Sequence, residues 1–234
     1  TTGNYGIYLL TSANGNLIQS NNITASGTTT NYGVFLSTAS SNKIYANNIT
    51  ASGITKTGAT NNRGVYVVTN SITNDIANNS IWTHGGATNI GLYFLTDSNG
   101  NNATGNNITT NGGSTTNYGA LVSASTSNLI NFNTIWTNGT NTNYGVYLFS
   151  SAQHNVVADN NITTNGTTSH ALYFAVSGTS YPNFNNISRN IIKWLNPSSV
   201  DFSLGSASIN NTFLINQQVR NYSLTAVGGL VYVR

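Results

Sequence analysis

The chain has 234 residues, of which only 5% are charged, against about 25% in an ordinary soluble domain. It contains no Cys, which excludes disulfides and thiolate metal sites, and its seven Lys and Arg residues form no basic stripe that would predict nucleic-acid binding. No run of about 18 apolar residues predicts a membrane span. Because the chain lacks an initial Met and a signal-peptide pattern, we expect a part of a longer polypeptide.

A strand-like run opens the chain and then recurs. It is "YGIYL" at Tyr5 and "YGVFL" at Tyr32, and it is found eight times at spacings of 26 to 31 residues. Its alternating apolar residues predict a β-strand in each copy. The eight runs cover residues 5–9, 32–36, 63–67, 90–94, 118–122, 144–148, 170–174 and 200–204.

A second pattern, Asn-x-Ile-x-x-Asn-x-Ile, follows each run and predicts two more short strands separated by a turn. Its first Asn falls at Asn16, Asn42, Asn74, Asn101, Asn128, Asn155, Asn185 and Asn211. Its second Asn falls at Asn21, Asn47, Asn79, Asn106, Asn133, Asn160, Asn190 and Asn216. Three strands per copy, closing into one coil, predict a parallel β-helix whose rungs stack about 4.8 Å apart.

The predicted fold class is therefore all-β: a right-handed single-stranded parallel β-helix of about eight rungs of three short strands. We expect this β-helix to occupy residues 1–218. Residues 219–234 are expected to form a C-terminal capping strand or to lead into a further domain. Aliphatic columns that begin at Ile7, Leu9, Ile18 and Ile23 should fill the interior.

The two Asn columns are expected at the corners of the rungs. There each Asn should adopt the left-handed backbone conformation, which Asn tolerates better than most residues. Its side-chain amide should bond to the Asn above and the Asn below, so that the amides satisfy one another along the whole stack.

These repeats resemble those of right-handed parallel β-helix proteins of the pectate-lyase-like superfamily. The Asn-x-Ile-x-x-Asn-x-Ile pattern is most similar to that of NosD-like proteins and of many archaeal and bacterial surface proteins. The similarity covers about residues 4–218. It implies the fold, whereas the functions of the superfamily range over polysaccharide lyases, epimerases, adhesins and structural surface proteins.

Enzymes on this fold rely on clustered carboxylates, which bind calcium or act as acid and base. The four acidic residues here are too far apart in the repeat for any two to share a neighbourhood: Asp75, Asp97, Asp159 and Asp201. The three histidines fall in three different columns, which argues against a zinc site or a Ser-His-Asp arrangement: His84, His154 and His170. We therefore expect no catalytic residue, no metal and no cofactor.

An outward column of aromatic residues lies between the two inward columns of the first strand. It predicts a contact strip for a ligand or a neighbouring subunit, formed by Tyr8, Phe35, Tyr66, Tyr93, Tyr147 and Tyr173. Alternatively, loops cover the strip or the rings stabilise one another.

Sequons of the form Asn-x-Ser/Thr are dense, and position selects six candidates for N-glycosylation. Four of them precede an inward Ile and should point outward: Asn22, Asn48, Asn107 and Asn161. The other two, Asn138 and Asn165, are expected in loops after the third strand.

Low charge, stacked amides and the family resemblance together favour a non-catalytic structural glycoprotein located outside the cell or at its surface. The expected role is a β-helical subunit of a filament, sheath or S-layer-like assembly of archaeal type. Its expected partners are copies of itself or further domains of the same polypeptide, and glycans are a further class of partner. The alternatives are a carbohydrate-binding adhesin that uses the aromatic column and a polysaccharide lyase or epimerase-like enzyme.

Overall fold

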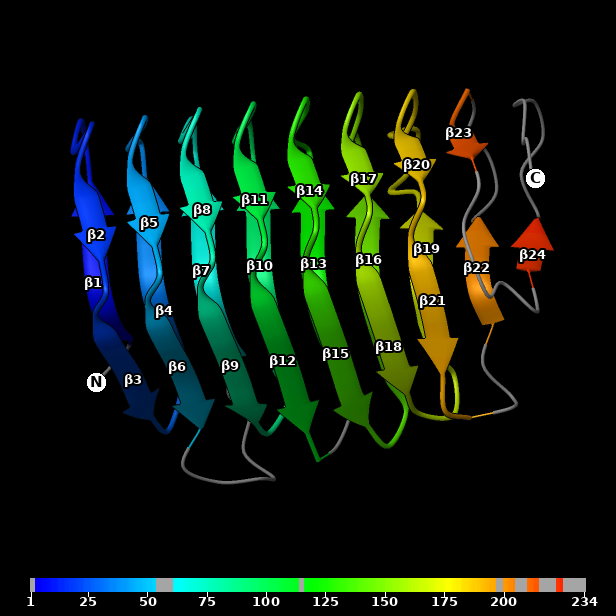
Figure 1. Cartoon of the computed structure of the whole chain (residues 1–234), viewed down its shortest axis with the longest axis horizontal. Helices are drawn as coiled ribbons and strands as arrows, with labels where there is room; N and C mark the ends of the chain where they lie inside the picture. Colours follow the sequence, from blue (N-terminus) through cyan, green and yellow to red (C-terminus); the bar gives the residue numbers. More distant parts are fainter. Residues whose placement is uncertain are drawn as a thin grey trace.

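The computed structural model describes residues 3–53, 61–113, 116–196, 200–204, 210–214 and 222–224. All regular elements within these residues are β-strands. The chain winds as a row of similar coils that lie side by side from its N-terminal to its C-terminal part (Figure 1). Corresponding strands of successive coils pair in parallel, and they build three separate sheets.

The first sheet contains β1 (Asn4–Leu10), β4 (Thr30–Ser37), β7 (Asn61–Val68), β10 (Thr88–Leu95), β13 (Thr116–Ser123), β16 (Thr142–Phe149), β19 (His170–Ala175), β22 (Val200–Leu204) and β24 (Tyr222–Leu224). The second contains β2 (Leu17–Gln19), β5 (Lys43–Tyr45), β8 (Asp75–Ala77), β11 (Asn102–Thr104), β14 (Leu129–Asn131), β17 (Val156–Ala158), β20 (Asn186–Ser188) and β23 (Thr212–Leu214). The third contains β3 (Asn22–Gly27), β6 (Asn48–Gly53), β9 (Ser80–Gly85), β12 (Asn107–Gly112), β15 (Thr134–Gly139), β18 (Asn161–Asn165) and β21 (Ile191–Trp194).

Seven coils, from β1–β3 to β19–β21, supply one strand to every sheet. An eighth copy supplies β22 and β23, and β24 extends the first sheet. The predicted parallel β-helix is thus confirmed, with seven complete coils in the described part of the chain where about eight were expected. Of residues 219–234 only β24 is described, and the role of this segment as a cap or a lead into a further domain stays a prediction.

The interior of the coil is filled by the aliphatic columns that the repeat predicts. In the third sheet, for example, Ile49, Ile108 and Ile135 are fully buried and lie in register with their counterparts on the neighbouring strands. Ile7 and Leu9 of the first coil are only partly buried but pack against the same core. Each buried aliphatic side chain contributes about 1.5–3 kcal/mol, most of which offsets the entropy lost when the backbone is ordered.

Both predicted Asn columns form continuous ladders among the described residues, and Asn216, the last predicted member of the second column, lies outside them. We call the column from Asn16 to Asn211 the first ladder and the column from Asn21 to Asn190 the second ladder. In the second ladder, Asn79 donates from its backbone N–H and from Nδ2 to Oδ1 of Asn106, each at 3.0 Å. Its Nδ2 also donates to the carbonyl of Ile44 in the preceding coil, at 2.8 Å. The side-chain amide of each such Asn therefore donates two hydrogen bonds and accepts two. No polar atom of this buried group lacks a partner, so the bonds offset the cost of removing it from water.

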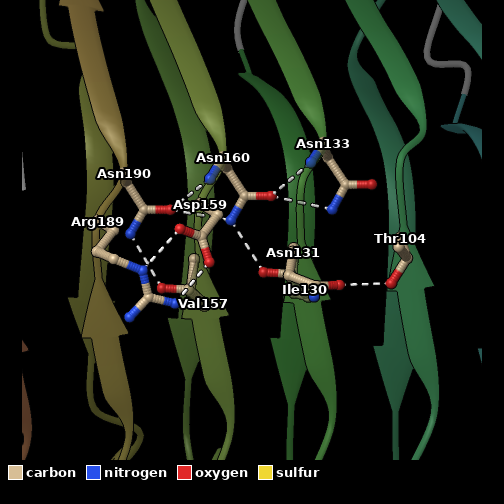
Figure 2. Close-up of polar contacts among 9 residues, drawn as sticks. All are labelled: Thr104, Ile130, Asn131, Asn133, Val157, Asp159, Asn160, Arg189 and Asn190. Atoms are coloured by element: carbon tan, nitrogen blue, oxygen red, sulfur yellow. Dashed lines mark hydrogen bonds and ion pairs between the residues drawn. The ribbon is translucent and has the colours of Figure 1, made fainter.

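Figure 2 shows the same arrangement farther along the second ladder. Oδ1 of Asn160 accepts the backbone N–H and Nδ2 of Asn133, and Asn160 in turn donates both groups to Asn190. On the outer side of this corner, Arg189 makes a bidentate ion pair with Asp159. The Arg189 guanidinium holds the pKa of the Asp159 carboxyl below its usual range. Because the pair is exposed, it adds little stability.

The left-handed residue at each corner is not the ladder Asn, and that expectation was wrong. The residue immediately before it takes this conformation, as at Ala46 (φ 52°) and Phe132 (φ 53°), which precede Asn47 and Asn133. No ladder Asn has a positive φ among the described residues. The left-handed residue turns the chain, and the following Asn can then point its side chain into the corner. Since the conformation costs about 1–2 kcal/mol for a residue with a Cβ, the ladder bonds and the core must hold it in place.

Strands of the first sheet bend at a glycine, where strict in-and-out alternation fails. In β4, Gly33 and Val34 are consecutive and both buried. A Cβ on Gly33 would lie 2.2 Å from Cγ2 of Ile49 and 2.6 Å from the carbonyl oxygen of Gly64. Glycine at this position therefore allows the first and third sheets to approach each other closely. Its equivalents are Gly6, Gly64, Gly91, Gly119 and Gly145, with Ala171 in the seventh coil.

A third Asn ladder, which the sequence analysis did not predict, lies inside this bend. Nδ2 of Asn31 donates to Oδ1 of Asn62 at 2.8 Å, and Asn62 donates to Asn89 at 2.9 Å. Asn31, Asn62 and Asn89 are fully buried. The ladder contains Asn4, Asn31, Asn62, Asn89, Asn117 and Asn143, and it ends on Oγ of Ser169. From the first coil to the sixth, each coil is thus tied to the next by three amide columns rather than two.

A column of buried threonines lines the third sheet and makes no compensating hydrogen bond. The Oγ1 atoms of Thr83, Thr110, Thr137 and Thr164 have no partner among the described residues. We predict that Thr110→Val raises the free energy of unfolding by about 1 kcal/mol, because valine keeps the shape and removes the desolvated hydroxyl. Denaturant titration would test this. Thr109→Val, which changes the outward neighbour, should alter stability much less, and a destabilised T110V variant would contradict the assignment.

Candidate functional site

The predicted aromatic column lies in register along the first sheet. Tyr8 pairs with Phe35, Phe35 with Tyr66 and Tyr66 with Tyr93, and after Leu121 the column resumes at Tyr147 and Tyr173. Exposure is uneven along the column. Tyr8 is 48% exposed, whereas Tyr66 is only 8% exposed. A ligand or subunit contact through these residues stays a prediction.

A second outward column runs beside the first and was missed. It contains Tyr5, Tyr32, Arg63, Ile90, Tyr118, Tyr144 and His170. The bend at glycine turns this column outward, because strict alternation counted from Tyr8 places Tyr5 inside. The two columns together form what we call the aromatic strip.

Rings in the aromatic strip are stacked on one another. Tyr66 and Tyr93 stack with centroids 5.0 Å apart, and Tyr32 and Phe35 stack at 5.5 Å. The guanidinium of Arg63 lies 4.2 Å from the centroid of Tyr66 and donates from Nη1 to the hydroxyl of Tyr32 at 2.8 Å. Ring faces that pack against neighbours in this way are not free to receive a sugar ring. The geometry favours mutual stabilisation of the strip over carbohydrate stacking on it.

Burial raises the pKa of several tyrosines in the aromatic strip. The pKa of Tyr66 rises to about 12 because burial disfavours the phenolate, although Arg63 opposes the shift. The pKa of Tyr118 also rises to about 12, again mainly through burial. Burial shifts the pKa of Tyr144 and of Tyr147 in the same direction.

These shifts predict an alkaline loss of stability. A tyrosine whose pKa is higher in the folded than in the unfolded chain favours folding while it is protonated. Its contribution to the free energy of unfolding is complete below about pH 10 and is lost as the pH rises from about 10 to about 12. Because the chain has only three His, the side chain that ordinarily changes charge near neutral pH, Tm should change little from about pH 6 to pH 9 and fall above about pH 10. Thermal melts at a series of pH values would measure this dependence of Tm on pH. Tyr118→Phe should reduce the alkaline fall, whereas Tyr45→Phe on the exposed face of the second sheet should not; equal behaviour of the two variants would refute the prediction.

Acidic residues do not converge among the described residues. Asp75 accepts a hydrogen bond from Nδ2 of Asn102 at 3.1 Å, and Asp159 pairs with Arg189. Asp97 lies in a turn, and the side chain of Asp201 lies outside the described part. The described residues contain no group of three or more His, Asp or Glu side chains that could hold a metal ion.

Histidines also lie apart from one another. His84 packs on Trp82, His154 stacks on Phe184, and His170 belongs to the aromatic strip.

No described helix is long and apolar enough to span a membrane.

The six N-glycosylation candidates lie on the outer face of the third sheet. Asn22, Asn48 and Asn107 are exposed at the first position of their strands, and Asn161 is half-buried at the equivalent position. The expectation of loop positions for the other two was wrong, because Asn138 lies in β15 and Asn165 ends β18. These two side chains also bond to each other, at 2.9 Å. Occupancy of the sequons stays a prediction.

Two exposed tryptophans on the same face also escaped the sequence analysis. Trp82 is 44% exposed and Trp136 is 47% exposed, at a position where four other coils carry Thr and the seventh carries Lys193. A cavity of about 330 Å³ adjoins Trp82 and is lined by Trp82, His84, Gly85, Asn111 and Gly113. The signal in the sequence was the departure of "SIWTHG" and "TIWTNG" from the "NIT" found in other copies.

No family model matches the chain, and no characterised protein matches it in sequence. Among solved structures, the chain is similar to the catalytic domain of a GH87 alpha-1,3-glucanase variant in complex with tetrasaccharides, with 13% sequence identity and a TM-score of 0.36. The match covers 97% of this chain and 53% of the other, so the chain spans about half the length of that domain. At this distance the likeness carries no conclusion about activity. The chain itself is a parallel β-helix with three asparagine ladders.

Proposed function

We propose that the chain is a non-catalytic structural protein: a β-helical subunit of a filament, sheath or S-layer-like assembly at the outside of a cell, related to NosD-like surface proteins. The observation that carries the proposal is the continuity of the three Asn ladders. Two of them pass through all seven complete coils and the third passes through the first six, without a change of register. Such ladders stabilise the solenoid itself and prepare no reactive group.

The charge distribution supports the same function. The described acidic side chains each have a separate environment, so none has the second carboxylate that glycoside hydrolysis requires. A surface of amides and hydroxyls keeps its character as pH and salt change, because few groups titrate or are screened. These properties suit a material exposed to a variable environment.

Self-association is the second part of the proposal, and the first coil supports it. Tyr5, Tyr8, Leu10 and Leu17 are between 43% and 60% exposed there, which makes an apolar face. A further coil, from the same polypeptide or from a second copy, would pair with β1 and place its own outward side chains beside Tyr5 and Tyr8, as Tyr32 and Phe35 lie on the other side.

Electron microscopy of the native material, combined with sedimentation of the purified chain, would test the proposal. We expect ordered assemblies, and we expect Tyr5→Asp to weaken association at least tenfold because it places a charge beside the edge at which β1 would pair. Phe132→Asp is the matched control: Phe132 is 61% exposed but lies at a corner in the middle of the solenoid, so association should not change. Dispersed monomers, or turnover of a polysaccharide that is lost in an Asp159→Asn or Asp75→Asn variant, would contradict the proposal.

A further inference from the structure

The outer face of the third sheet is free of charged side chains from β3 to β18. Its outward residues are Asn, Ser, Thr and His, with two Trp. The first charged residue in these columns is Lys193 on β21, which pairs with Thr163 of β18. A face of this composition has no electrostatic preference for an anionic or a cationic partner.

Trp82 and Trp136 stand out on this face because the fold does not need them. Their column reads Thr24, Thr50, Trp82, Thr109, Trp136 and Thr163 in register. Four coils therefore form the same strand with Thr, and the two indoles remain nearly half exposed. Thr109 lies between them, so the indoles are two rungs apart, about 9.6 Å. The small Thr109 leaves both indoles accessible from the same side.

The cavity of about 330 Å³ places polar groups beside one of these indoles. Trp82 packs on His84, with ring centroids 4.4 Å apart, at one side of the cavity. Asn111 lines it as well, is exposed, and makes no side-chain hydrogen bond to another described residue. The volume of the cavity is near the lower end of the range for small-molecule sites, roughly 300–1,000 Å³.

We propose that the outer face of β9, β12 and β15 binds a neutral carbohydrate chain. One sugar ring stacks on Trp82, and a hydroxyl group of that ring donates a hydrogen bond to the side-chain amide of Asn111 or accepts one from it. A second sugar ring of the same chain reaches Trp136. A sugar ring offers an apolar face for an indole and hydroxyl groups for an amide, which is the combination present here. The absence of charge on this part of the sheet favours a neutral chain over an anionic one.

A peptide fits this face less well. Each of the strands β9, β12 and β15 is paired on both sides, so a peptide could not add a strand to their edges. The aromatic strip on the first sheet is a separate surface. The proposal is independent of the assembly proposed above, because neither Tyr5 nor the first coil belongs to this face.

Titration calorimetry of the full chain with neutral hexasaccharides would test the proposal: cellohexaose, laminarihexaose, maltohexaose and mannohexaose, with hexagalacturonate as the anionic comparison. We expect at least one neutral chain to bind and to change tryptophan emission, since two of the three tryptophans lie in the site. Trp82→Thr and Trp136→Thr should each weaken binding about tenfold. Both variants install the residue that other coils carry at this position, so the fold is preserved.

Two control variants separate this site from other exposed aromatic residues. Phe132→Asn installs the residue that Asn78 provides at the equivalent corner, and Tyr8→Thr removes a ring from the aromatic strip; both should leave affinity unchanged within twofold. The proposal is overturned if no neutral chain binds, if hexagalacturonate binds more tightly than every neutral chain, or if W82T and W136T bind as tightly as the unaltered chain. Loss of binding in Tyr8→Thr alone would assign the site to the aromatic strip instead.

Discussion

Replacing Asn106 by alanine should lower the free energy of unfolding by about 4 kcal/mol. Asn106 is 1% exposed, and its side chain takes part in four hydrogen bonds: Oδ1 accepts twice from Asn79, and Nδ2 donates to Ile76 and to Asn133. Each bond contributes about 1 kcal/mol net. The backbone N–H of Asn79 is left buried without its acceptor, which adds to the loss.

Denaturant titration followed by circular dichroism would measure the change. Asn107→Ala is the matched control, because Asn107 is the next residue and points outward from the third sheet. It should alter stability by no more than about 0.5 kcal/mol. If N106A and N107A were equally stable, the ladders would not be a source of stability.

Gly119→Ala is the second change for which we expect a large loss, about 3 kcal/mol. A Cβ on Gly119 would lie 2.2 Å from Cγ2 of Ile135 and 2.5 Å from the carbonyl oxygen of Gly145. The side chain can be displaced, but the carbonyl belongs to the next strand of the first sheet and cannot move without breaking the register. Overpacking of this kind costs about 1–3 kcal/mol.

A double-mutant cycle with Ile135→Ala would identify the cause. Removing the side chain of Ile135 should cost about 2–5 kcal/mol alone, since the residue is fully buried. The double variant should be about 1 kcal/mol more stable than the sum of the two changes predicts, because one of the two clashes has gone. Strict additivity would show that contact with Ile135 does not determine the need for glycine.

The coil, the aliphatic columns and two of the three ladders could be predicted from the sequence because they repeat with regular spacing. Ile49 and Ile108, for example, occupy the same place in their copies and the same place in the core. Repetition fixes which residues are stacked. It does not by itself fix which side of the strand they face.

The bend at glycine explains what the sequence analysis missed. Counted from Val34 with period two, Asn31 points outward and Tyr32 inward, yet the structure buries Asn31 and turns Tyr32 outward. Two consecutive inward residues, Gly33 and Val34, reverse every assignment before them. The third ladder and the second half of the aromatic strip both depend on this reversal. Recurrence of glycine at one position was visible, but its close approach to Ile49 is a property of the assembled coil.

The corner residues show a second limit. Ala46 and Phe132 adopt the left-handed conformation although neither residue favours it. Local propensity therefore pointed to the neighbouring Asn, while the assembled ladder imposes the conformation on the residue before it. The candidate site on the third sheet was similarly hidden, because two Trp among many Thr carry no periodic signal.

Hydrogen exchange of side-chain amides, measured by NMR, tests the central claim most directly. If the chain winds as a coil whose Asn side chains stack in register, the Nδ2 protons of Asn47, Asn79 and Asn106 should be protected to the level of the core backbone amides, since both their bonds are buried. The Nδ2 protons of the outward Asn22 and Asn107 should exchange rapidly. Equal, rapid exchange at all five positions would contradict the ladders and the coil that they hold together.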